Sequence, residues 1–240
     1  MANEAGEWII RGIAKSDPRC IRSAQALIEY VDEVGFLPLF KNALPDFSVE
    51  ERTAAEDWWT GSRHDPWAWR EEIARSGKLA YGKLFERKAG FISLRWLPTF
   101  LNYRRNGYDF DARWEDGLAT YREKKIMDLF ETRDSLLSNE IKALAGFQKG
   151  GEKNFEGTLT ALGMKTYLTV CDFRRRLNAR GEPYGWSIAV YAKPETVWGE
   201  AFTAKGYGEE PEISRARILE ALSRRCPGAA EKQMLRMIGA

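Results

Sequence analysis

EKNFEGTLTALGMKTYLTVCDFRRRLNARGEPYGWSIAVY, residues 152–191, is the stretch that decides the fold. Its first part places Phe155, Leu159 and Leu162 at i, i+4 and i+7, which predicts a short helix that ends at Gly163. TYLTVCDF then alternates as a strand does, RRRLNARGEPYG turns the chain, and WSIAVY pairs back. The stretch therefore predicts a helix, a strand, a basic turn and a second strand.

A helix and the glycine turn FQKGG precede this stretch, so that the order becomes helix, turn, helix, strand, basic turn, strand. That order is typical of the winged-helix variant of helix-turn-helix, in which the second helix enters the major groove and the hairpin, or wing, follows the DNA backbone. We therefore expect double-stranded DNA as the partner. The candidate DNA-binding residues are the basic side chains of the wing and its edge: Lys149, Lys153, Lys165, Arg174, Arg175, Arg176 and Arg180.

The basic turn has a second interpretation. Its arginines can form a solvated turn in which they pair with nearby carboxylates such as Asp172 and Glu182. The charge of the whole chain does not decide between the two, because 37 Lys and Arg against 35 Asp and Glu leave a net charge of only +2. So small a charge gives no global field that attracts nucleic acid, and any affinity for phosphate must be local.

The N-terminal part of the chain predicts helices. SAQALIEYVDEVG has apolar residues on one stripe and predicts a helix at residues 23–34 that stops at Gly35. A second helix start is predicted at Ser48, which begins a Ser-x-x-Glu capping box. A third is predicted at Asp65, because proline follows it at the first helical position, and that helix ends at Gly77.

The remaining pattern defines the fold class. Two β-prone runs around a charged turn predict a hairpin at 79–93, beside the wing hairpin at 166–191. Helical spacing at 118–144 offers these core positions: Leu118, Tyr121, Ile126, Leu129, Leu137, Ile141 and Leu144. We expect a helix-rich α+β fold built on winged-helix units with short antiparallel hairpins. The expected segments are an N-terminal segment (1–22), a helical region with a degenerate winged-helix unit (23–115), a winged-helix domain (116–200) and a C-terminal helical segment (201–240).

Composition excludes several classes of protein. With 240 residues, of which 44% are hydrophobic, the chain can bury a core. It has no apolar run typical of a signal peptide or a transmembrane helix, so we expect a cytoplasmic monomer without membrane contact. The three cysteines lie far apart without CxxC spacing, and His64 is the single histidine. We therefore expect no disulfide framework, no metal site and no cofactor.

Three stretches resemble the winged-helix DNA glycosylases typified by AlkZ, bacterial enzymes that remove alkylated and crosslinked bases. YVDEVGFLPLFKN is similar to the N-terminal helix of that family and the segment after it, EDWWTGSRHDPWAW to its tryptophan-bearing segment, and residues 136–191 to one of its winged helices. The similarity spans residues 25–200 and is closest to the short AlkZ-related proteins. It implies a DNA partner and a role in base excision.

The resemblance also points to a catalytic residue. In the full-length enzymes a Gln-x-Gln or Gln-x-Asp pair lies on the N-terminal helix, and the matching positions here are Tyr30 and Asp32. The carboxylate is kept and the first glutamine is missing. A carboxylate can stabilise a cationic sugar and orient water for hydrolysis of an N-glycosidic bond. Asp32 also lies at the edge of the apolar stripe of its helix, where a side chain can line a cleft; the alternative is an ordinary solvated carboxylate.

An aromatic pocket for a flipped base is the second part of this hypothesis. Trp58, Trp59 and His64 are its candidates together with Tyr30, although tryptophans at helical spacing also fit a core. The expected activity is that of a monofunctional DNA glycosylase. Two alternatives stay open: a DNA-binding lesion sensor or regulator that releases no base, and a module that binds another protein.

Overall fold

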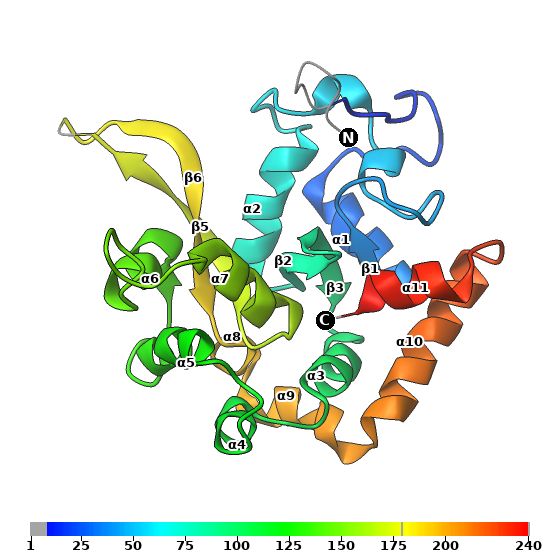
Figure 1. Ribbon diagram of the computed structural model, residues 1–240. Coiled ribbons are helices and arrows are strands. Elements are labelled where there is room, and N and C mark those ends of the chain that lie inside the picture. Colours follow the sequence, from blue (N-terminus) through cyan, green and yellow to red (C-terminus); the bar gives the residue numbers. More distant parts are fainter. Residues whose placement is uncertain (1–8, 179, 240) are drawn as a thin grey trace. The chain divides into compact units, whose positions relative to one another are not determined.

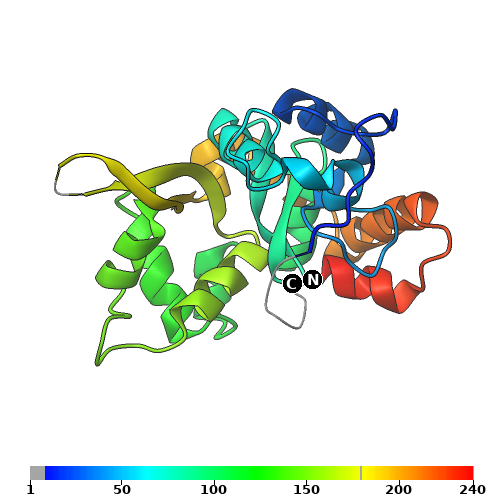
Figure 2. The same ribbon diagram turned by 90° about the horizontal axis from the view of Figure 1, so that it is seen from above.

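The computed structural model describes residues 9–178 and 180–239. In those residues the chain forms helices α1–α11, short 3₁₀ turns and two three-stranded antiparallel sheets (Figures 1 and 2). This confirms the expected helix-rich α+β fold with antiparallel hairpins. The chain divides into two compact units: one runs to Trp96 and resumes at Ala216–Gly239, and the other is Leu97–Arg215. The boundaries expected from the sequence pattern, at residues 22, 115 and 200, stay a prediction.

The first unit packs helices on a small sheet. Strand order is β1-β3-β2, with Phe36 opposite Ile92 and Tyr81 opposite Phe91. Its elements are α1 (Ala24–Val34), β1 (Phe36–Pro38), α2 (Pro66–Ser76), β2 (Leu79–Phe85), β3 (Lys88–Ser93), the end of α10 (Pro211–Arg225) and α11 (Glu231–Ile238). Its core includes Leu27, Val31, Phe36, Leu37, Ile73, Phe91 and Ile92.

The ends of α1 follow from its sequence. The Ser23 hydroxyl accepts a hydrogen bond from the Ala26 N–H and begins the helix. Gly35 ends it with φ of 93°, where an L side chain is strained, and a Cβ there would lie only 2.6 Å from Nε1 of Trp96. The predicted helix at 23–34 and its stop are therefore confirmed.

The helix expected after Ser48 is one 3₁₀ turn, Glu50–Arg52. The capping contacts do form, because the Ser48 hydroxyl donates to Glu51 Oε2 over 2.6 Å and accepts from the Glu51 N–H. The chain leaves the turn at Thr53, whose backbone is extended. A capping box therefore starts a turn here, but no amphipathic run follows to extend it.

The second unit carries the stretch that decides the fold. Its sheet has the order β4-β6-β5. Its elements are α3 (Leu97–Arg105), α4 (Phe110–Glu115), α5 (Tyr121–Met127), β4 (Leu136–Leu137), α6 (Ser138–Leu144), α7 (Phe155–Met164), β5 (Thr169–Leu177), β6 (Pro183–Ala192), α8 (Pro194–Trp198), α9 (Glu200–Thr203) and the start of α10. Apolar side chains of α5, α6 and α7 form one core: Ile126, Met127, Ile141, Phe155, Leu159 and Leu162.

Two sequence expectations in this unit were wrong. β5 runs to Leu177, so that Arg174, Arg175 and Arg176 lie in a strand and not in the turn. Pairing with β6 continues there through irregular register, with Arg176 opposite Tyr184. Three expected core positions, Leu118, Tyr121 and Leu144, are exposed. Their helices are only seven residues long or absent, so a single helical period does not hold across 118–144.

Candidate nucleic-acid interface

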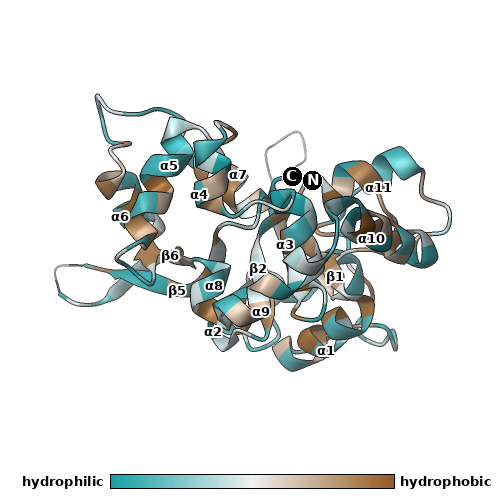
Figure 3. Cartoon of the chain, turned by 90° about the horizontal axis from the view of Figure 1, so that it is seen from below, coloured by the Kyte–Doolittle hydropathy of each residue, from teal (hydrophilic) through white to brown (hydrophobic). Residues whose placement is uncertain are grey.

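Strands β5 and β6 form a long two-stranded arm that extends past α6 in each view (Figures 1, 2 and 3). Its inner half is anchored: Phe173 and Val190 are buried, and β4 pairs with the end of β6. Its outer half is exposed from Arg174 onward and is coloured mainly as hydrophilic along β5 (Figure 3). The anchored base fixes the direction in which the outer side chains are presented.

The outer arm concentrates positive charge. Arg174, Arg175, Arg176 and Arg180 are all exposed. Of the two carboxylates that could neutralise them, Asp172 lies 3.8 Å from Nε of Arg174, a loose and exposed contact. The other, Glu182, accepts from the side chain of Asn178. Within the described part of the chain the guanidinium groups of Arg175 and Arg176 have no ion-pair partner, so the solvated-turn interpretation accounts for only one arginine.

Exposed apolar and aromatic side chains lie on the same arm as these arginines. Leu177 is 62% exposed, Tyr184 49% and Trp186 70%, although hydrophobic side chains of this size are usually covered. A groove of about 490 Å³ lies along the arm, mainly on its exposed outer half. It is lined by Leu137, Asn139, Arg174, Arg175, Arg176, Leu177, Tyr184 and Ile188.

The three candidate lysines differ in availability. Lys149 and Lys153 are exposed in the loop between α6 and α7. Lys165 donates to Glu123 Oε1 across 2.6 Å, and the Glu123 side chain is only 4% exposed. Burial alone would raise the pKa of Glu123, but hydrogen bonds from Lys165 and from the Thr120 backbone outweigh it, so that the pKa is lowered. Lys165 is therefore engaged in joining α7 to the start of α5.

Asp32 and Tyr30 lie near the C-terminal end of α1. The Asp32 side chain is exposed, and its carboxylate has no partner among the described residues. Arg95 caps the helix by donating from Nη2 to the Asp32 carbonyl oxygen over 2.9 Å. The Tyr30 ring is contacted by two guanidinium groups, with Cζ of Arg52 5.5 Å and Cζ of Arg225 5.7 Å from its centroid. Two guanidinium groups thus lie against the Tyr30 ring, and a third, that of Arg95, contacts the backbone at Asp32.

The tryptophan-bearing segment is a hydrogen-bonded loop that leads into α2. Trp58 is buried and donates from Nε1 to the Thr53 hydroxyl over 2.9 Å, and its ring lies 5.7 Å from that of Trp59. His64 is exposed; its Nδ1 lies 3.2 Å from the Arg22 carbonyl, and its Nε2 accepts from Arg63. The structure thus brings Trp58 and Trp59 together, and it places His64 at the surface of the loop.

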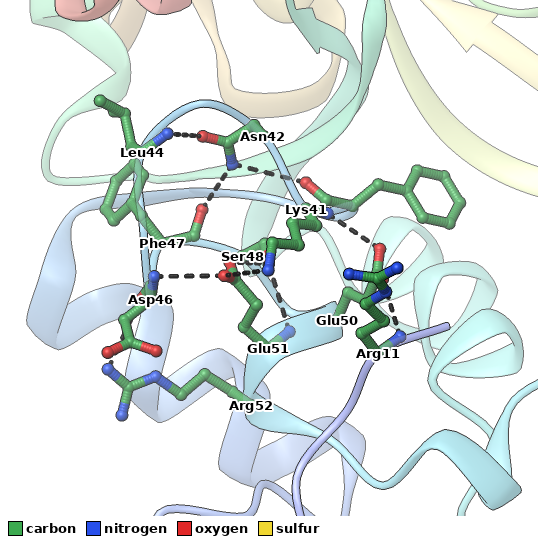
Figure 4. A network of polar contacts seen from close by, with 11 residues as sticks. Arg11, Lys41, Asn42, Leu44, Asp46, Phe47, Ser48, Glu50, Glu51 and Arg52 are labelled. Carbon is green, nitrogen blue, oxygen red and sulfur yellow. Dashed lines mark hydrogen bonds and ion pairs between the residues drawn. The ribbon is translucent and has the colours of Figure 1, made fainter. Parts of the chain in front are cut away.

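A buried carboxylate that the sequence did not single out organises the neighbouring loop (Figure 4). Glu50 is 1% exposed and accepts hydrogen bonds from the backbone N–H groups of Arg11 and Lys41, at 3.0 and 2.9 Å. Beside it, Glu51 accepts from the Ser48 hydroxyl. These contacts join the segment before α1 to the loop that follows β1, and Arg52, in the same turn as Glu50 and Glu51, lies against the Tyr30 ring. The sequence gives little sign of this role for Glu50, because the backbone N–H groups that donate to it belong to residues distant in the chain.

Among the described residues no cluster of three or more His, Cys, Asp or Glu side chains is arranged to hold a metal ion. In the same residues no helix is long and apolar enough to cross a membrane.

Comparison with protein families shows to which family the chain belongs. A family model described as AlkZ related matches residues 21–239, from the start of α1 to the end of α11. The chain belongs to the AlkZ-related family. The resemblance to the short AlkZ-related proteins is thereby confirmed, and the match extends through the C-terminal helices. No curated protein and no solved structure matches the chain.

Proposed function

We propose that this AlkZ-related protein binds double-stranded DNA in the repair of modified bases, with the β5–β6 arm as its main contact. The observation that carries the proposal is the exposed arginine set on a strand pair anchored at its base. Because the net charge is only +2, a local cluster is what can give phosphate affinity. Membership of the AlkZ-related family supports repair as the context.

Element order supports a winged-helix assignment for the second unit. The order is α5, β4, α6, α7, β5, β6, and the short strand β4 pairs with β6. In winged-helix proteins the second helix of the helix-turn-helix enters the major groove and the wing follows the backbone. Here α7 is buried over most of its length and its exposed charged side chain is Glu156, which phosphate repels. We therefore assign the main phosphate contacts to the arm and keep Lys149 and Lys153, which are exposed in the loop between α6 and α7, as further candidates.

Affinity for a short duplex tests the proposal. Replacing Arg174, Arg175 and Arg176 with glutamine removes three phosphate contacts, and we expect binding at about 100 mM salt to weaken by about tenfold or more. The matched control replaces three exposed basic residues elsewhere, Arg215, Arg224 and Lys232. It should change affinity much less. Equal losses in both variants would show non-specific charge attraction, and unchanged binding in the arm variant would refute the proposal.

Hydrolysis of the N-glycosidic bond is the second candidate, and the position of Asp32 favours it. This carboxylate is exposed and lacks a partner among the described residues. By the sequence resemblance it matches the second position of the catalytic pair of the full-length AlkZ enzymes. In that role it stabilises the sugar cation and directs water. An abasic site without strand cleavage is the expected product, because a lyase step needs an amine nucleophile and α1 has no lysine. The neighbouring Arg52, Arg95 and Arg225 oppose a cationic transition state, so binding without base release is our primary conclusion.

A further inference from the structure

The groove along the arm combines two kinds of lining side chain. Of its eight lining residues, three are arginines and none is a carboxylate. The others supply one phenol ring, one amide and three aliphatic side chains: Tyr184, Asn139, Leu137, Leu177 and Ile188. A volume of about 490 Å³ is within the range of small-molecule sites.

Strand register explains how the two kinds of side chain meet. Arg174 is paired with Ile188, and Arg176 with Tyr184. Residues paired directly across two strands share a face of the sheet. Each of these pairs therefore places a guanidinium group beside an apolar or aromatic side chain. Leu137, at the end of β4, and Asn139, in the first turn of α6, also line the groove.

The combination of arginines with apolar and aromatic side chains indicates which kind of ligand fits the groove. Guanidinium groups recognise phosphate through directed, charge-assisted hydrogen bonds. An aromatic ring beside aliphatic side chains offers a flat apolar surface to a nucleobase, and an amide can bond to a base edge. A phosphate alone would leave the apolar wall unused, and an apolar ligand would make no use of the three guanidinium groups.

We propose, on the basis of the DNA binding proposed above, that this groove binds one unstacked nucleotide of a DNA strand. Its phosphates lie against the arginines and its base against Tyr184 and Ile188. In an intact duplex the faces of the bases are covered by neighbouring bases, so they cannot contact the apolar side chains of the groove. A bulged nucleotide has already lost part of its stacking, so its entry costs less free energy. The protein therefore prefers duplex DNA with an unpaired nucleotide over the intact duplex.

The test compares fluorescence anisotropy with a labelled intact duplex, the same duplex with one bulged nucleotide, and a labelled acidic peptide. Stacking on one aromatic side chain predicts a preference for the bulged duplex of about fivefold or more. In Tyr184→Ala the ratio of the two affinities should fall to about one, and in Tyr184→Phe, which keeps the ring, it should persist. Tyr121→Ala is the matched control, since Tyr121 is exposed on α5 outside the groove, and it should keep the wild-type ratio.

The outcomes separate this inference from the proposed function. If the wild type binds both duplexes equally, or if Tyr184→Ala keeps the preference, the groove does not hold an unstacked nucleotide although the arm binds DNA. If neither duplex is bound, the proposed function fails together with the inference. Binding of the acidic peptide in place of DNA would overturn the assignment of the occupant to nucleic acid.

Discussion

Lys165 Nζ lies 2.6 Å from Glu123 Oε1 and ties the end of α7 to the capping box of α5. Glu123 is almost fully buried, so removing the ammonium leaves a carboxylate whose desolvation is no longer offset. We expect Lys165→Met to lower the free energy of unfolding by about 2 to 3 kcal/mol, below the value for a fully buried pair because Lys165 is partly exposed. Urea denaturation measures it, with exposed Lys149→Met as the control. Equal stability of the two variants would contradict a structural role for Lys165.

The same pair predicts a dependence of stability on pH. The pKa of Glu123 is lower in the folded protein than its ordinary value of 4.5. Its contribution is therefore fully present above that ordinary value and is lost as pH falls through the lowered folded pKa. The difference in unfolding free energy between wild type and Glu123→Gln should be constant near neutral pH and shrink in acid. A difference that stays the same from neutral to strongly acidic pH would rule out this linkage.

Arg105 is a second buried charged residue, and it joins three other segments of its unit. It donates to Glu195 at 2.6 Å, to the Tyr207 hydroxyl at 2.8 Å and to the Thr166 carbonyl at 2.8 Å. Arg105→Met leaves all three acceptors without this donor and should cost about 3 to 5 kcal/mol. The control is Arg122→Met, which breaks an exposed pair with Glu152 and should change stability little. The comparison uses thermal or urea unfolding. A small loss for Arg105→Met would mean that water replaces its contacts.

Local signals predicted much of the fold. The helix at 23–34, the α2 limits at Asp65 and Gly77, and both hairpins follow from caps, glycines and alternation, which act over a few residues. The extent of β5 could not be read in the same way. Three successive arginines have no apolar alternation, and their extended backbone depends on pairing with β6. Helical spacing at 118–144 was misleading because the 3₁₀ turn Asp128–Phe130 and the short strand β4 interrupt the helix.

The candidate site was predictable in part. The arm arginines stood out because charge clustering is visible in sequence, and their exposure agrees with that expectation. Engagement of Lys165 by Glu123 was not predictable, since the partners are 42 residues apart. The groove could not be predicted from the sequence for the same reason, because its lining residues come from segments that are distant in the chain.

Asp32→Asn tests the catalytic candidate. If Asp32 stabilises the sugar cation, the variant should keep its affinity for alkylated duplex and release bases at least about 100-fold more slowly. Base release is measured by conversion of the product abasic sites to strand breaks with alkali. Glu29→Gln, an exposed carboxylate on the same helix, is the control. Wild-type protein that binds alkylated duplex and releases no base would leave the sensor alternative in place.

The salt dependence of duplex binding tests the central claim most directly. If four arm arginines neutralise phosphates, a plot of the logarithm of the binding constant against the logarithm of salt concentration should have a slope of about −3 to −4. Replacing Arg174, Arg175 and Arg176 should reduce the magnitude of that slope by about 3, and the control with Arg215, Arg224 and Lys232 replaced should keep it. Binding that does not depend on salt, or a slope unchanged in the arm variant, would contradict DNA recognition by the arm.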